Sequence, residues 1–125
     1  MRRKSVKGVL MRYEKTVKDD LIILKILENR VDSKMAPELK KEFLAVIVQD
    51  TPNIIIDLSE ISYMDSSGLG TLLFARRQAE RFQGKLVIAN PGPKVQKLIE
   101  IAHLTQTLMI FNSLNEAIEV YKNDK

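Results

Sequence analysis

The hydrophobic residues of this chain recur with two different periods, and each change of period marks a boundary between secondary-structure elements. Two apolar-rich segments, 11–17 and 21–27, flank the polar residues Lys18-Asp19-Asp20, which predicts two paired strands joined by a tight turn. The continuous β-branched run Ile54-Ile55-Ile56 is typical of a strand that is covered on both faces. Two further short runs with β-type composition lie at 85–89 and 108–111.

Between these runs, apolar side chains recur at spacings of three and four, which indicates amphipathic helices. Four such helices are expected, at about 35–47, 69–82, 95–102 and 114–121. Asp32-Ser33 and Asn112-Ser113 are the expected caps of the first and last, and Gly84 closes the second. The predicted order is therefore β-β-α-β-α-β-α-β-α, which predicts an α/β fold with a largely parallel sheet and covering helices.

Length and composition limit the classes of protein to consider. With 125 residues, of which 45% are hydrophobic, the chain is long enough for one core and too short for two. It has no cysteine and a single histidine, His103, so a disulfide framework, a thiolate metal site and a cofactor held by several imidazoles are not expected. Its longest apolar runs fall far short of the roughly 20 residues of a membrane helix, so no membrane insertion is expected.

The net charge of +4 is concentrated at the start of the chain. Arg2, Arg3, Lys4 and Lys7 carry four positive charges, and the remainder has 16 basic and 16 acidic residues. We therefore predict a basic, flexible N-terminal extension over residues 1–10, a single domain over 11–125 and no direct nucleic-acid partner. A contact of the extension with an anionic membrane or nucleic acid stays open. The extension lacks the roughly 7 to 15 apolar residues of a secretory signal, so we expect a cytoplasmic protein.

Polar residues that could take part in binding or modification lie between the end of the run Ile54-Ile55-Ile56 and the start of the second helix. Asp65, Ser66 and Ser67 open that helix, and their side-chain oxygens are suited to accept the free N–H groups of its first turn. The same N–H groups and the positive end of the helix dipole favour an added phosphate. The residues alone thus fit either a helix cap or a phosphorylation site.

The segment Y-M-D-S-S-G-L-G, following I-I-I-D-L, resembles the hallmark of anti-sigma factor antagonists, members of the STAS domain family. The resemblance extends from about Met11 over nearly the whole chain, including the N-P-G-P turn and the segment I-A-H-L-T-Q-T-L-M-I-F. It implies a STAS-type mixed, largely parallel sheet with covering helices. It also implies that Ser66, the first serine after the aspartate, is phosphorylated by a partner kinase, with Ser67 as the second candidate.

The resemblance further implies a partner-binding surface around the serine. The family pattern close to G-E-L-D matches N-R-V-D here, which places Asp32 at the family aspartate, whereas Asn29 and Arg30 replace the glycine and glutamate. This replacement bears on which kinase is recognised. Asp32 also fits a helix cap, and Asp65 and Ser67 join it as expected partner contacts. Two more residues are expected to contact the partner but also fit internal packing of the helix: Gly68 and Leu69.

What the resemblance implies about function is partner switching. The unphosphorylated protein would bind an anti-sigma factor serine kinase and free a sigma factor, phosphorylation would release the kinase, and a serine phosphatase would reset the cycle. The kinase would supply ATP and magnesium, so this chain needs no cofactor and is not expected to be an enzyme. A STAS module that acts as a structural subunit of a larger stress-signalling assembly is an alternative.

Other enzymatic and regulatory interpretations have less support in the sequence. Neither G-x-S-x-G nor a glycine-rich phosphate-binding motif is present, and His103 is the only histidine available as a base for a serine nucleophile. Asp57, Glu60 and Asp65 lie close together in sequence, as in a solvated loop. Asp57 also resembles the acceptor of a phospho-aspartate receiver, although the acidic pair and the lysine of a receiver are missing. That receiver is the second alternative function.

Overall fold

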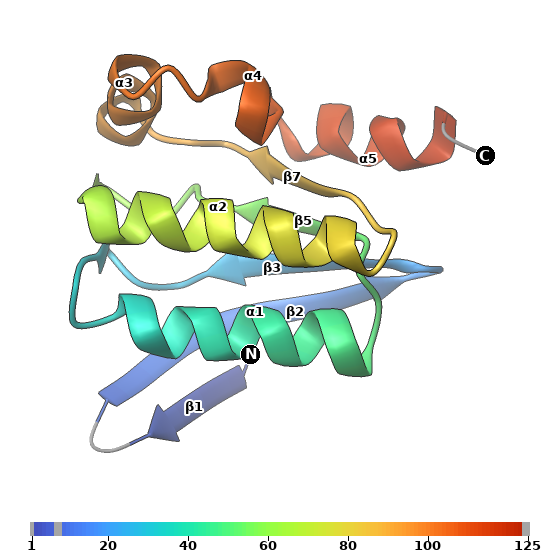
Figure 1. Cartoon of the computed structure of the whole chain (residues 1–125), viewed down its shortest axis with the longest axis horizontal. Helices are drawn as coiled ribbons and strands as arrows, with labels where there is room; N and C mark the ends of the chain where they lie inside the picture. The colour runs from blue at the N-terminus through green and yellow to red at the C-terminus, as the bar shows by residue number, and fades with distance from the viewer. Residues whose placement is uncertain (1, 7–8, 124–125) are drawn as a thin grey trace.

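A six-stranded mixed sheet is the central element of the computed structural model, which describes residues 2–6 and 9–123 and the side chains of 12–122 (Figure 1). In sheet order, its strands are β1 (Arg2–Val6), β2 (Val9–Lys18), β3 (Leu21–Ile26), β5 (Ile54–Asp57), β7 (Leu86–Ala89) and β8 (Ile110–Phe111). The pairs β1–β2 and β2–β3 are antiparallel, whereas the pairs β3–β5, β5–β7 and β7–β8 are parallel. This arrangement confirms the predicted mixed, largely parallel sheet.

A second, two-stranded parallel sheet lies beside the first and consists of β4 (Arg30–Val31) and β6 (Tyr63–Met64). The helices are α1 (Ala36–Gln49), α2 (Ser66–Arg81), α3 (Pro93–Ile101), α4 (Thr105–Leu108) and α5 (Leu114–Asn123). The helices α1 and α2 lie side by side in front of the large sheet, and α5 lies toward its β7 and β8 side (Figure 1).

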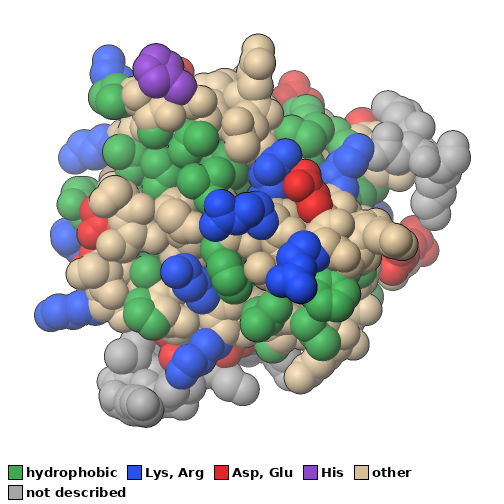
Figure 2. Space-filling view, viewed as in Figure 1, with side chains coloured by type: hydrophobic (Ala, Val, Ile, Leu, Met, Phe, Trp, Pro, Cys, Tyr) green, Lys and Arg blue, Asp and Glu red, His purple; other side chains and the backbone are tan. Residues whose placement is uncertain are grey.

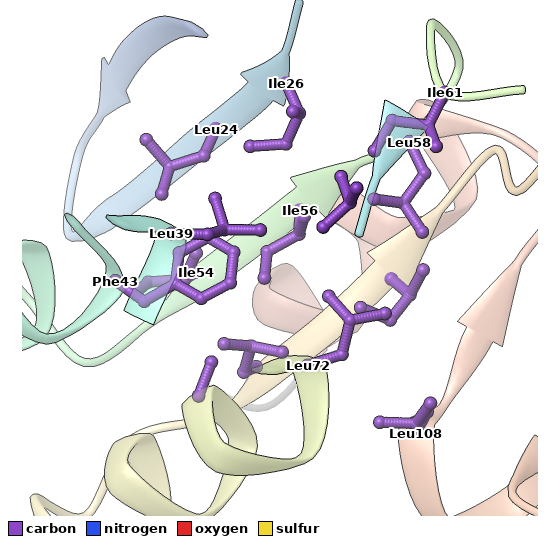
Figure 3. Close-up of a cluster of buried hydrophobic side chains, with 14 of the residues drawn as sticks. Leu24, Ile26, Leu39, Phe43, Ile54, Ile56, Leu58, Ile61, Leu72 and Leu108 are labelled. Atoms are coloured by element: carbon purple, nitrogen blue, oxygen red, sulfur yellow. The ribbon is translucent and has the colours of Figure 1, made fainter. Parts of the chain in front are cut away.

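The side chains of β5 show why this sheet is covered on both faces. Ile54 and Ile56 belong to the larger core cluster, together with Phe43 of α1 and Leu72 of α2 (Figure 3). Ile55 points the opposite way, into a smaller cluster that includes Ala117 of α5. All three isoleucines are fully buried. The β-branched run therefore occupies the position that its composition predicted, because alternate side chains of a strand face opposite sides of the sheet.

The predicted elements and the observed ones differ most near the end of the chain. The expected strand at 108–111 is shorter, because Leu108 ends α4 and Met109 adopts a left-handed conformation with φ of 51°. Only Ile110 and Phe111 then pair with β7. The last helix begins as predicted, since Ser113 Oγ accepts a hydrogen bond from the Glu116 backbone N–H at 3.1 Å.

The N-terminal region also differs from the prediction. Residues 1, 7 and 8 of the predicted extension lie outside the described residues, whereas Arg2–Val6 forms a strand that pairs with β2 at the edge of the sheet. The element boundary that was expected at residue 11 is not present, because β2 begins at Val9. An edge strand of mainly polar sequence carries no apolar alternation, which is why the pattern did not reveal it. The flexibility of the extension stays a prediction.

The surface charge of the domain is unevenly distributed. Lys and Arg side chains gather over the face formed by α1 and α2 (Figure 2), where four of them are exposed: Lys40, Lys41, Arg77 and Arg81. The two acidic residues of α1, Glu38 and Glu42, are buried. The balanced charge count therefore does not produce an evenly neutral surface. Among the helices that the structure describes, none has the length and hydropathy needed to cross a membrane.

Candidate functional site

The small sheet formed by β4 and β6 brings two segments that are distant in sequence to the start of α2. Arg30 pairs with Tyr63 and Val31 with Met64. The Asp65 backbone N–H donates to the Val31 carbonyl at 3.3 Å, which continues this pairing by one step. Asp32 and Asp65 directly follow these two paired strands, so the fold brings both sequence-predicted aspartates to the end of the small sheet from which α2 begins.

The side chain of Asp65 caps α2. Asp65 Oδ1 accepts a hydrogen bond from the Gly68 backbone N–H at 3.1 Å, and the extended conformation of Asp65 ends the preceding strand. The cap that the sequence assigned to three candidate residues is thus Asp65. Ser66, the first helical residue, is exposed, and no hydrogen bond involves its hydroxyl among the described residues. The Ser66 side chain is therefore accessible to solvent.

The second serine has a different environment. Ser67 is half-buried, and its backbone carbonyl accepts a hydrogen bond from Thr71 Oγ1 at 3.0 Å. Thr71 itself is fully buried. The two serines thus differ in exposure although they are adjacent in the sequence, and Ser66 is the more accessible of the two.

Gly68 and Leu69 have the internal packing roles that the sequence left open, and their expected contacts with a partner stay predictions. A Cβ atom on Gly68 would lie 2.6 Å from Met64 Cγ and 2.8 Å from the Val31 carbonyl oxygen, so only glycine allows α2 to pack this closely on the small sheet. Leu69 is 6% exposed and belongs to the larger core cluster. Both residues therefore position the start of α2. Gly70, by contrast, has open space around it.

Asp32 stabilises the turn before α1 but does not cap that helix. The residue at the N-cap position is Met35, whereas Asp32 Oδ1 accepts hydrogen bonds from the backbone N–H groups of Lys34 at 3.0 Å and Met35 at 3.3 Å. Desolvation opposes ionisation of this carboxyl, but these two hydrogen bonds and the positive charge of Arg30 outweigh it and lower the pKa of Asp32. The carboxylate is therefore ionised and held in a fixed orientation.

Asn29 and Arg30, the two departures from the family pattern, contact the loop that precedes Ser66. The Asn29 carbonyl accepts a hydrogen bond from the Ser62 backbone N–H at 2.8 Å, and its side-chain oxygen accepts one from Ser62 Oγ at 2.6 Å. The Arg30 guanidinium lies 4.4 Å from the centre of the Tyr63 ring, and its Nε lies 3.6 Å from Asp32 Oδ2. The sequence pattern identifies Arg30 but not Tyr63 as its neighbour, because two-residue strands have no detectable periodicity.

Asp57 and His103, which the sequence offered as possible catalytic or acceptor residues, lie in other surroundings. Asp57 is buried, and its Oδ1 accepts hydrogen bonds from the Ser59 backbone N–H at 3.0 Å and from Asn90 Nδ2 at 3.4 Å. His103 is exposed at the end of α3. Within the described residues, no three His, Asp or Glu side chains gather in a way that could hold a metal ion.

Comparison with known proteins identifies the class to which this arrangement belongs. The model of the STAS domain family matches residues 12–117, and the chain therefore belongs to the STAS domain family. An anti-sigma-B factor antagonist of Listeria monocytogenes is 33% identical over 82 residues, which cover 66% of this chain and 72% of that protein. An anti-sigma-B factor antagonist of Staphylococcus aureus is 26% identical over 110 residues, covering 88% of this chain and 97% of that protein.

Solved structures show the same fold. The anti-sigma factor antagonist SpoIIAA in its unphosphorylated form is 22% identical, with a TM-score of 0.69 over 90% of this chain and 97% of that one. At this identity the likeness concerns the fold alone. The expected family membership and mixed sheet are thus confirmed, whereas the roles of individual site residues stay predictions.

Proposed function

We propose that this chain is an anti-sigma factor antagonist that switches partners through phosphorylation of Ser66. In the unphosphorylated form it binds an anti-sigma factor serine kinase and so frees a sigma factor. Phosphorylation by the kinase, which supplies ATP and magnesium, releases the antagonist, and a serine phosphatase restores it. The protein itself is a binding switch without catalytic activity, and it acts in the cytoplasm.

The observation that carries this proposal is the separation of the Asp65 cap from the exposed Ser66 hydroxyl. A phosphate on Ser66 would not displace the cap, and it would lie at the positive end of the α2 dipole, which stabilises an anion by about 0.3 to 1 kcal/mol. The domain therefore stays folded when it is phosphorylated. Phosphorylation therefore changes only the charge of the surface that a partner contacts.

Release of the partner follows from charge. A phosphoserine adds about −1.5 to −2 charges at neutral pH. At Ser66 these charges would lie beside the carboxylates of Asp65 and Asp32, on a surface where the partner previously faced a neutral hydroxyl. Like charges forced into an interface cost several kcal/mol, so we expect phosphorylation to weaken kinase binding by about a hundredfold or more.

The proposal is tested by titrating the purified protein against the anti-sigma factor kinases of its source organism, with isothermal titration calorimetry as the readout. Unmodified protein and Ser66→Ala should bind one kinase, and Ser66→Asp and phosphorylated protein should bind it weakly. Ser67→Ala is the matched control and should still be phosphorylated, as mass spectrometry can show. Equal binding of the phosphorylated and unmodified forms, or labelling of Ser66→Ala, would contradict the proposal.

Each of the two alternative functions predicts a result that differs from that of the proposed switch. A phospho-aspartate receiver would carry a phosphate that hydroxylamine removes, whereas phosphoserine is stable to it. The burial of Asp57 and the two hydrogen bonds to its carboxylate disfavour that receiver. A structural STAS module would form a stable complex with its assembly and would have no kinase partner.

A further inference from the structure

The outer face of the small sheet carries an arginine and a tyrosine that are already arranged for binding. Val31 and Met64 point inward and are buried, so their neighbours Arg30 and Tyr63 point outward, at the edge of the surface that contains Ser66. The side chain of Arg30 is 59% exposed and Tyr63 is 40% exposed.

The guanidinium of Arg30 has a neighbour on each of two sides. Its Cζ lies over the Tyr63 ring, 4.4 Å from the ring centre, and Asp32 Oδ2 lies 3.6 Å from its Nε. Asp32 is itself held by the backbone N–H groups of Lys34 and Met35. Among the described residues, no hydrogen bond is made by the two terminal nitrogens of Arg30. Arg30 thus has Tyr63 and Asp32 as neighbours, while its terminal N–H groups have no acceptor among the described residues.

We propose that Arg30, supported by Tyr63, determines which kinase this protein binds by forming a two-point ion pair with a carboxylate of the kinase. The inference rests on the proposed function and specifies the partner of the same surface. A guanidinium presents parallel N–H donors that match the two oxygens of a carboxylate, and this pairing is stronger and more directional than a contact with lysine. Arginine and tyrosine are also the residue types that contribute most to protein interfaces.

Charge complementarity favours an acidic partner residue at this position. Of the nearby acids, Asp65 is engaged as the helix cap and Asp32 lies on the Nε side of Arg30, so neither satisfies the terminal N–H groups. A partner built for an acidic residue at position 30 would present a cation here, and the Arg30 charge would repel it. Arg30 therefore favours kinases that present a carboxylate at this position and disfavours kinases that present a cation there.

The experiment uses the full chain and the kinase identified by the titration described above. Arg30→Gln should weaken binding by at least about tenfold and Arg30→Glu by about a hundredfold, because the second change also introduces repulsion. Arg30→Lys should fall between wild type and Arg30→Gln, since it keeps the charge and loses the paired donors. The matched control is Arg77→Gln, an exposed arginine about three turns along α2, which should change affinity less than threefold.

The outcomes separate this inference from the proposed function. If wild type binds the kinase and phosphorylation releases it, but Arg30→Gln binds as tightly as Arg77→Gln, the assignment of Arg30 is wrong and the switch stands. If wild type binds no kinase, the proposed function itself fails. Circular dichroism melts establish that each variant is folded. Restored binding between Arg30→Glu and a kinase whose facing carboxylate is changed to lysine would identify the paired residue directly.

Discussion

The Asp65 carboxylate accepts a hydrogen bond from the Gly68 backbone N–H at 3.1 Å across the first turn of α2. Such a cap satisfies a donor that has no partner within the helix itself. Because Asp65 performs this task, the hydroxyl of the adjacent Ser66 is not needed for it. Stability and the proposed switch therefore depend on two neighbouring side chains whose effects can be measured separately.

Removal of the cap should destabilise the domain. Asp65→Ala is expected to lower the free energy of unfolding by about 1 kcal/mol, because the Gly68 N–H loses its acceptor. Asp65→Ser retains an oxygen at the same place and should lose less. Urea unfolding followed by circular dichroism provides the comparison, and an Asp65→Ala variant as stable as wild type would show that the cap contributes nothing.

Changes at Ser66 should leave stability nearly unaltered. The side chain is exposed and its hydroxyl makes no hydrogen bond among the described residues, so Ser66→Ala should stay within about 0.5 kcal/mol of wild type. The phosphorylated protein should stay folded with similar stability, since the helix N-terminus favours the anion and offsets repulsion from the nearby carboxylates. Thermal melts of the three forms test this. A markedly lower melting temperature for the phosphorylated protein would mean that unfolding contributes to the switch.

The two glycines near the start of α2 form a matched pair. Gly68→Ala should lower the free energy of unfolding by about 1 to 3 kcal/mol, because the added methyl group would overlap Met64 and the Val31 carbonyl. Gly70→Ala meets nothing within 4 Å and should raise stability by about 0.5 to 1 kcal/mol through the higher helix propensity of alanine. Chemical unfolding of both variants checks the difference. Equal effects of the two changes would contradict the packing described for Gly68.

The lowered pKa of Asp32 predicts a specific dependence of stability on pH. Desolvation opposes this shift, but the hydrogen bonds from Met35 and Lys34 and the charge of Arg30 outweigh it. Since the pKa is lower in the folded state, the ionised carboxylate stabilises the fold above its unfolded pKa of about 3.9, and this contribution is lost as the pH falls through the folded pKa. The advantage of wild type over Asp32→Asn should therefore shrink on acidification.

The measurement is a series of urea titrations of wild type and Asp32→Asn between about pH 6 and pH 3, compared at each pH. Asparagine keeps an oxygen that can accept the two backbone hydrogen bonds, so the difference isolates the charge. A constant difference across the series would show that Asp32 titrates at the same pH in the folded and unfolded states.

Several features of the molecule are determined by local sequence alone. The β-branched run at Ile54–Ile56 predicts a strand covered on both faces, because it is short and β-branched residues favour strands over helices. The spacing of apolar residues after Asp65 predicts α2, and the Asp-Ser-Ser sequence predicts where it begins. These signals depend on residues within one or two turns of one another, so they are present in the sequence before any tertiary contact forms.

The tertiary structure alone decided how the site is assembled. The strands β4 and β6 contain two residues each and pair across 33 positions of sequence, so neither produces a periodic pattern. Their register brings the segments that lead into Asp32 and Asp65 together and places Arg30 over Tyr63. The same packing leaves Ser66 exposed and half-buries Ser67, a difference that two adjacent serines cannot show in sequence. Register and exposure depend on long-range contacts, which is the physical reason that only the folded chain could reveal them.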